Sequence, residues 1–482
     1  MLWRIVYWLG ALVGCMSLLP SPPTPKDSSR LSTPVMLDWS SLRNVNLATP
    51  SGKMIEAEFA SRREGRGTAH TDNDVRLFDL PSGTSPRVTF YKDSASWCPY
   101  CQKCWILLEE KRIPYKVEKI NMRSYGDKPE SFLRICPNGL LPAIKIDGGA
   151  VQTESVPIMM TLDRMFSGDS HKPMWPAHSK DQDRAQNLMN LERTLFSDWC
   201  GLVFRGGRGD ASRKRFEQTM DVVNRELGET SSPWFLNDLS IVDLQFVTHI
   251  ERMAASCVFW SGLQIRGARW PAIERWLQAF EAMPTYMATK SDYYTHVKDI
   301  PPQYGPGYSQ PGTEAFAKSI LGEDGSWSLP LKPLGENDVE FFSPVVPGTI
   351  YGKADIEESA RQEAAYKLII NHDNIVKFAC RGPGAPGRKQ FQAPLADPYA
   401  TPNLDYASDV DFYLKIVCQA LVGGEGSYKN LEKSVSRVPS EKRRGLQEAL
   451  VYLRDRIGVP RDMSYPAARQ LRAHLNWILE LL

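Results

Sequence analysis

Two cysteines three positions apart, Cys98 and Cys101, are the strongest chemical signal in this sequence. They stand in a CPYC stretch that follows an alternating apolar run at residues 87–92 and precedes an apolar helical pattern. A cysteine that opens a helix meets unpaired backbone amides and the positive end of the helix dipole, which stabilise a thiolate. We therefore expect Cys98 to be the nucleophile, and Cys101 to resolve a mixed disulfide.

A third cysteine, Cys104, follows at the same spacing and makes a metal or cluster site the competing interpretation. Such a site needs more ligands than this stretch offers, and Cys136 is the nearest cysteine outside it. The pattern favours redox chemistry and predicts no metal. For Cys104 we expect a small buried apolar side chain, while a redox or cluster role of Cys104 or Cys136 stays open.

The elements that must position these thiols alternate between strand and helix patterns over about 80 residues. The expected strands and helices lie at residues 87–92, 98–111, 115–120, 128–135, 143–147, 150–153 and 154–166. Residues 180–298 show helical patterns throughout, including a capping-box pattern at Ser240–Asp243. The sequence therefore predicts an α/β domain at 86–168 followed by an all-helical domain at 180–298.

Length and composition restrict the class of protein. The 482 residues allow two to four domains, and 58 basic against 56 acidic residues give a net charge of +2, so nothing in the charge predicts a nucleic-acid partner. Hydrophobic residues at 42% are typical of a globular protein. Nine cysteines, an odd number spread along the chain, argue against a secreted disulfide scaffold and for a reducing compartment.

The two ends of the chain carry no catalytic pattern. Arg4 precedes an apolar run at residues 5–19, which is typical of a targeting signal, and residues 24–85 lack periodicity. We therefore assign residues 1–85 to a targeting peptide and linker. The alternative is a retained interfacial anchor helix, the one case in which we expect membrane contact. Residues 299–350 are rich in Pro and Gly and predict a linker or wrapping arm.

Residues 351–482 predict a helical extension whose role the sequence does not state. Helical patterns recur at 356–379, 405–422, 439–457 and 465–482.

Four features together resemble a glutathione transferase of the cysteine type. They are the glutaredoxin-like CPYC at 98–101, NGLLPA at 138–143, the Glu154–Ser155 pair, and a helical half with LSIVD at 239–243 and a final Met283–Pro284. The resemblance covers roughly residues 87–298. It implies a thioredoxin-like domain at 86–168, an all-α transferase domain at 180–298, and glutathione as the cofactor.

The resemblance also implies the residues that hold glutathione. A cis bond before Pro142 would turn the backbone of Leu141 toward the cysteinyl part of the ligand. The Glu154 carboxylate would meet the amino group of the ligand, and the Ser155 amide its γ-glutamyl carboxylate. By similarity to the omega class, Lys128 would pair with the glycine carboxylate.

Each of these residues has an ordinary alternative role. Glu154 and Ser155 are also a plain helix cap, Pro142 a trans loop proline, and Lys128 a solvated charge. Tyr100 either packs over the site or faces solvent.

A cysteine at this position implies thiol transfer, because it forms a mixed disulfide with glutathione where other classes use a Ser or Tyr hydroxyl. The expected reactions are deglutathionylation and disulfide or dehydroascorbate reduction, with a small or protein disulfide as second substrate. The second cysteine and the long extension resemble the iota class of photosynthetic organisms, which favours a plastid location. A homodimer is possible for this family.

Two further functions stay open. One is a non-catalytic sensor or interaction protein that holds glutathione or another ligand. The other is a membrane-anchored isomerase resembling the CPxC-containing prostaglandin synthases. The family binds its second substrate near residues 188–204, where Phe196, Trp199 and Phe204 predict either an apolar cleft or plain core.

Overall fold

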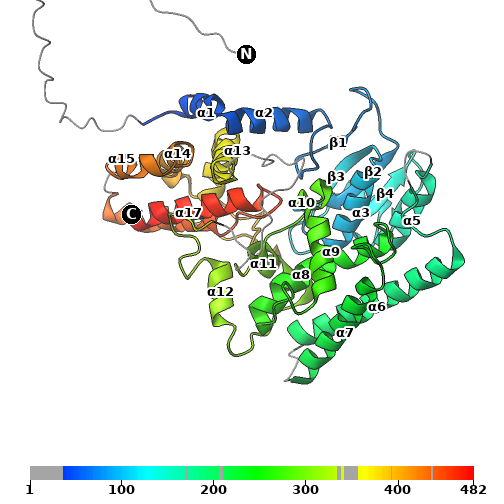
Figure 1. Ribbon diagram of the computed structural model, residues 1–482. Coiled ribbons are helices and arrows are strands. Elements are labelled where there is room, and N and C mark those ends of the chain that lie inside the picture. The colour runs from blue at the N-terminus through cyan, green and yellow to red at the C-terminus, as the bar shows by residue number, and fades with distance from the viewer. Residues whose placement is uncertain are drawn as a thin grey trace, which may run out of the picture.

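The computed structural model describes residues 36–168, 172–205, 210–333, 338–340, 356–391, 393–435 and 438–482 (Figure 1). The expected targeting signal and the anchor alternative, at residues 1–20, lie outside these ranges. Among the described helices, none combines the length and the apolar character needed to cross a bilayer.

A five-stranded sheet carries the α/β domain, in the order β1-β3-β2-β4-β5. The strands are β1 Val75–Arg76, β2 Val88–Asp93, β3 Tyr115–Ile120, β4 Ala143–Ile146 and β5 Gln152–Thr153. β2 and β3 are parallel with Val88 opposite Tyr115, while β4 runs antiparallel to both β2 and β5. The helices of this domain are α3 Pro99–Glu110, α4 Glu130–Ile135 and α5 Ser155–Met165. The predicted thioredoxin-like fold is confirmed.

The all-helical domain packs beside α3 (Figure 1). Its helices are α6 Ser179–Val203, α7 Asp210–Gly228, α8 Ile241–Ser261, α9 Pro271–Glu281, α10 Pro284–Met287 and α11 Tyr293–Tyr304. The expected capping box opens α8, where the Ser240 amide donates to the Asp243 carboxylate at 2.9 Å. Almost every side chain of α8 is buried, so this helix is the centre of the domain.

Residues 36–85, which were expected to belong to a targeting peptide and linker outside the fold, contain regular secondary structure. They form α1 Trp39–Ala48, α2 Pro50–Arg63 and strand β1. Both helices pack against α13, Ile356–Ala379, of the extension. The Asn46 amide donates to the Gln362 carbonyl at 3.1 Å, and the Phe59 and Tyr366 rings lie 4.9 Å apart. The contact of α1 and α2 with α13 uses few apolar residues. The sequence of residues 36–85 therefore shows no apolar periodicity.

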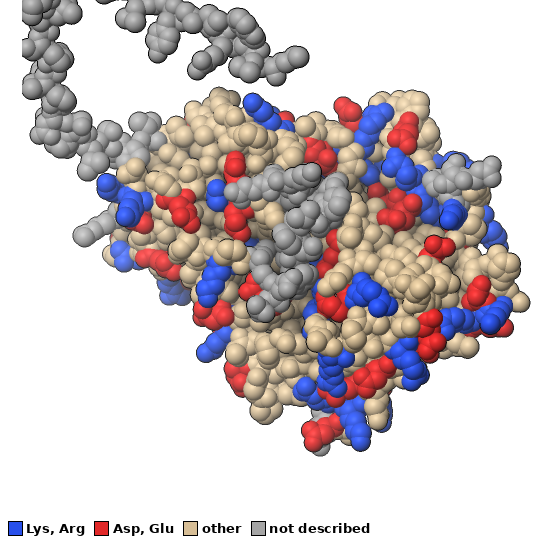
Figure 2. Space-filling view, in the orientation of Figure 1, with Lys and Arg blue, Asp and Glu red and all other residues tan. Residues whose placement is uncertain are grey.

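The C-terminal helices form a second core together with α1 (Figure 1). They are α13 Ile356–Ala379, α14 Ala407–Gly423, α15 Tyr428–Glu432, α16 Ser440–Arg454 and α17 Tyr465–Leu481. Between the two cores, the described part of 299–350 contains the end of α11 and α12 Glu314–Leu321. On the face in Figure 2, basic and acidic side chains are interspersed, in keeping with their near balance in the sequence.

Candidate active site at the start of α3

The end of β2 builds the turn that carries Cys98. The buried Asp93 carboxylate accepts hydrogen bonds from the backbone amides of Ala95 at 2.9 Å, Cys98 at 2.9 Å, and Trp97. Three buried amides that would otherwise lack a partner are thereby satisfied. The turn places Cys98 at the N-cap of α3, the position that the sequence predicted.

The pKa values of the two cysteines of the turn are shifted in opposite directions. The Cys98 sulfur accepts a hydrogen bond from the Cys101 amide at 3.4 Å. The Cys101 side-chain hydrogen bond lowers the pKa of Cys98, with the Cys101 amide and Arg252 adding to this effect, while burial and the Asp93 charge oppose it. Burial raises the pKa of Cys101 well above its ordinary value. The arrangement therefore favours a Cys98 thiolate beside a protonated Cys101.

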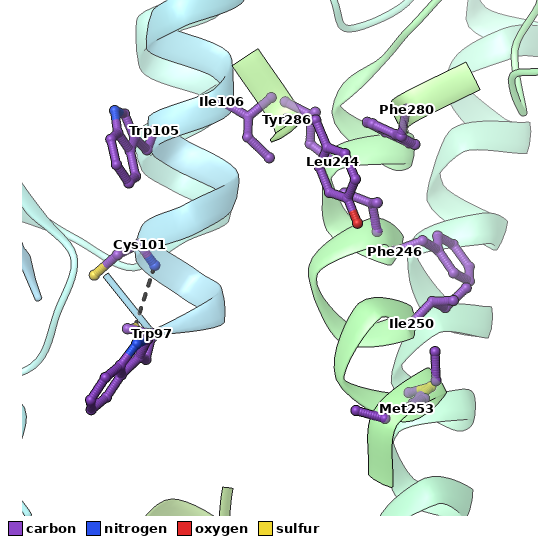
Figure 3. Close-up of a cluster of buried hydrophobic side chains, with 14 of the residues drawn as sticks. Trp97, Cys101, Trp105, Ile106, Leu244, Phe246, Ile250, Met253, Phe280 and Tyr286 are labelled. Carbon is purple, nitrogen blue, oxygen red and sulfur yellow. Dashed lines mark hydrogen bonds between the residues drawn. The ribbon is translucent and has the colours of Figure 1, made fainter. Parts of the chain in front are cut away.

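Arg252 of α8 brings a positive charge beneath the turn. Its guanidinium is buried and donates to the Trp97 carbonyl, to the Thr248 carbonyl at 2.6 Å and to the Gln102 side-chain oxygen at 2.9 Å. Figure 3 shows Trp97 and Cys101 at the start of α3, with the α8 residues Ile250 and Met253 across from them. Arg252 was not among the residues predicted for the site. The only signal in the sequence is an arginine in a helical stretch whose side chains are nearly all buried.

Two buried lysines near the same turn, Lys92 in β2 and Lys103 within α3, were also missed. Lys92 donates to the Ser96 hydroxyl at 2.6 Å, and Lys103 donates to the Gln245 side chain at 2.7 Å. Burial lowers the pKa of each to about 8. Three cationic groups that were not predicted from the sequence thus lie near the CPYC motif.

The predicted glutathione residues lie on the neighbouring elements. The Leu141–Pro142 peptide bond is cis, as the resemblance implied, and Pro142 is buried just before β4. Ser155 is the buried first residue of α5, whereas Glu154 is exposed at φ 71°. Tyr100 has 36% of its surface exposed. These positions suit the expected roles, which stay predictions.

Lys128 lines an open cleft of about 780 Å³. Its ammonium donates to the Asn121 carbonyl, and burial lowers its pKa. The other walls of this cleft include Gln303 and, from the extension, Gln390 and Phe391. A cationic group therefore lies in a space that a peptide carboxylate could enter.

The predicted apolar cleft near residues 188–204 is filled by the chain itself. The Tyr304 ring lies 5.5 Å from the ring of Trp199, 5.8 Å from Phe196 and 5.9 Å from Phe204. The segment after it continues over α6, where the Tyr308 amide donates to the Val203 carbonyl at 2.9 Å. Trp199 and Phe204 are buried and Phe196 is partly buried, which favours the alternative interpretation of these residues as core.

Among the residues that the structure describes, the remaining cysteines show no metal-ligand geometry. Burial raises the pKa of Cys104, which is completely buried, and its sulfur lies 3.5 Å from the Ser155 carbonyl oxygen. Within the ranges given above, no three His, Cys, Asp or Glu side chains converge as a metal site would require.

Comparison with known families separates the chain into a transferase part and the rest. Residues 97–165 match the glutathione S-transferase N-terminal domain, and residues 207–279 match its C-terminal domain. These matches fall on α3 to α5 and on α7 to α9, the two domains that meet beneath Cys98. This part of the chain is a glutathione transferase. Glutathione is accordingly the cofactor of the transferase part.

Individual relatives share this part of the chain. Glutathione S-transferase DHAR3, chloroplastic, of Arabidopsis thaliana is 42% identical over 158 residues, 32% of this chain and 55% of that protein. Pyrimidodiazepine synthase of Drosophila melanogaster is 28% identical over 201 residues, 40% of this chain and 78% of its own. Glutathione transferase Omega 3C from Trametes versicolor, a solved structure, is 20% identical and covers 50% of this chain and 94% of its own, with a TM-score of 0.37.

Proposed function

We propose that this transferase is a glutathione-dependent thiol transferase whose nucleophile is Cys98. The observation that carries the proposal is the pairing at the start of α3, where the pKa of Cys98 is lowered and that of Cys101 is raised. A thiolate at the N-cap of a helix suits disulfide chemistry with a peptide thiol.

The reaction that we propose starts from a mixed disulfide between glutathione and a second thiol. The Cys98 thiolate attacks the glutathione sulfur, a new disulfide forms between Cys98 and glutathione, and the second thiol leaves as a thiolate and takes a proton. A second glutathione thiolate then attacks the bound glutathione sulfur. This step releases glutathione disulfide and restores the Cys98 thiolate, so Cys101 is not needed for turnover.

The filled aromatic region supports disulfide reduction over conjugation. Tyr304 occupies the space where transferases were expected to hold an apolar second substrate. A disulfide needs only to bring one sulfur to Cys98, and its other half can stay in solvent. A chloroplastic relative, DHAR3, supports the plastid location that we propose for the chain.

Trapping of the intermediate tests this proposal. We expect the full chain with Cys101→Ser, which cannot resolve the mixed disulfide, to yield a peptide with one glutathione on Cys98 after treatment with glutathione disulfide and digestion without reductant. The same treatment after alkylation of Cys98 should yield none. Glutathione that is retained without any covalent adduct would instead favour the non-catalytic sensor.

Lys128 should govern the binding of glutathione more than the chemical step. Replacing it by methionine removes the charge from the cleft but keeps the apolar stem, so we expect the KM for glutathione to rise about tenfold. The value of kcat should change less than about twofold. Steady-state kinetics with varied glutathione measure both constants.

The matched control for this variant is Lys180→Met, which removes an exposed lysine at the start of α6. An unchanged KM in Lys128→Met would show that Lys128 is the solvated charge of the alternative interpretation.

A further inference from the structure

A loop of the extension lies directly against the residue before Cys98. This loop, residues 457–463, joins α16 to α17. The Trp97 indole N–H donates to the Val459 carbonyl at 3.2 Å, and the Arg461 guanidinium lies 4.9 Å from the centre of the Trp97 ring. Trp97 has only 1% of its surface exposed, so the loop forms part of its enclosure.

Gly458 shows how close this approach is. A Cβ atom on Gly458 would lie 2.6 Å from Cζ2 of Trp97, a distance that side chains do not tolerate. The φ angle of Gly458 lies outside the left-handed region, so its backbone does not itself require glycine. What requires glycine here is the indole ring.

The loop is itself fixed by segments far away in sequence. The Val459 amide donates to the Thr295 hydroxyl at 3.0 Å, and the Ser291 hydroxyl donates to the Val459 carbonyl. The Thr71 hydroxyl donates to the Arg461 carbonyl at 2.9 Å. The start of α11 and the segment after α2 thus hold the loop against the catalytic turn.

The backbone and the ring of Trp97, the residue before Cys98, are both held by neighbouring residues. Its amide donates to Asp93, and its carbonyl accepts from Arg252. The Tyr125 ring packs on its indole at 5.4 Å. A shift of the ring would therefore move the peptide unit that Trp97 shares with Cys98, and with it the N-cap geometry that stabilises the thiolate.

We propose that the 457–463 loop is a positioning element of the active site, which holds Cys98 in place by clamping the Trp97 ring. The extension thereby acts on the reactivity of the thiol as well as on the stability of the fold. This inference rests on the proposed function only in taking Cys98 as the reacting thiol.

A pair of glycine substitutions in the full chain tests the clamp. We expect Gly458→Ala to lower the rate constant for alkylation of Cys98 by iodoacetamide at pH 7 by about tenfold or more. The matched control is Gly426→Ala, in the same extension, where an added Cβ meets nothing within 4 Å and the rate should stay the same. Peptide mapping assigns the label to Cys98, and the pH profile gives its apparent pKa.

A double-mutant cycle separates positioning from general destabilisation. Trp97→Phe removes the outer ring that a Cβ on Gly458 would strike, so Gly458→Ala should have little further effect in the Trp97→Phe background. An equal loss in both backgrounds would overturn the proposal, as would a fully reactive Gly458→Ala protein.

Arg461→Ala serves if Gly458→Ala does not fold, because it removes the cation over the ring without a clash. We expect a severalfold lower alkylation rate of Cys98, and an unchanged rate would overturn the clamp. A wild-type Cys98 that reacts no faster than a free cysteine would remove the proposed function as well. If Cys98 is reactive in the wild-type chain but its alkylation rate is the same in every loop variant, the proposal for the loop is wrong and the proposed function stands.

Discussion

Replacing Cys98 by serine is expected to lower thiol transfer by at least about a thousandfold, because a serine hydroxyl stays protonated at neutral pH and forms no disulfide. Release of glutathione from a glutathionylated peptide, followed by chromatography, measures the effect. The trapped adduct with glutathione should disappear in the same variant. A Cys98→Ser protein with full activity would place the chemistry elsewhere.

The matched variants lie at Cys101. Cys101→Ser keeps a hydrogen-bond donor for the Cys98 thiolate, so it should retain most of the activity. Cys101→Ala removes the donor that most lowers the pKa of Cys98. Since a raised pKa leaves less thiolate at pH 7, the alkylation profile of Cys101→Ala should move to higher pH. An equal profile for both variants would contradict the role assigned to this hydrogen bond.

Arg252→Met should cause the second large loss, about 10- to 100-fold in thiol transfer. The change removes a buried cation that favours the Cys98 thiolate, and it leaves the carbonyls of Trp97 and Thr248 without this donor. We therefore expect a Cys98 alkylation profile shifted to higher pH and a lower midpoint of unfolding in urea.

Arg252→Lys separates charge from geometry. Lysine keeps the positive charge but cannot reproduce the planar set of donors, so the pH profile should recover more than the unfolding midpoint does. Arg275→Met, at an exposed position of α9, is the control for loss of an arginine from the helical domain. An unchanged pH profile in Arg252→Met would show that this charge does not act on Cys98.

Much of the fold could be predicted because it follows from short-range patterns. The strand predicted at 115–120 has the same bounds as β3, and the helical stretch predicted at 356–379 has the same bounds as α13, which the structure interrupts with a kink at Asn371. Helices α1 and α2 were missed because their apolar residues are few and their partner helix lies about 300 positions away. Patterns along one segment do not record such a distant contact.

The residues of the candidate site also fall into those that the sequence predicted and those that it did not. Spacing and motif order indicated Cys98, Cys101 and the loop with Pro142, since each depends on a few consecutive residues. The aromatic content of 188–204 left an apolar cleft and plain core as alternatives, and only the structure shows Tyr304, from a segment expected as a linker or wrapping arm, packed against these rings.

The sequence by itself determined the helix start that carries Cys98, the nucleophile that we propose, because a cysteine at an N-cap needs only its own turn of backbone. Only the tertiary structure decided what surrounds that turn. Arg252 of α8 contacts Trp97, the Tyr304 ring packs against Trp199, and the 457–463 loop contacts the Trp97 indole. Burial of a charge or a ring depends on packing between segments hundreds of residues apart, and local patterns contain no record of that packing.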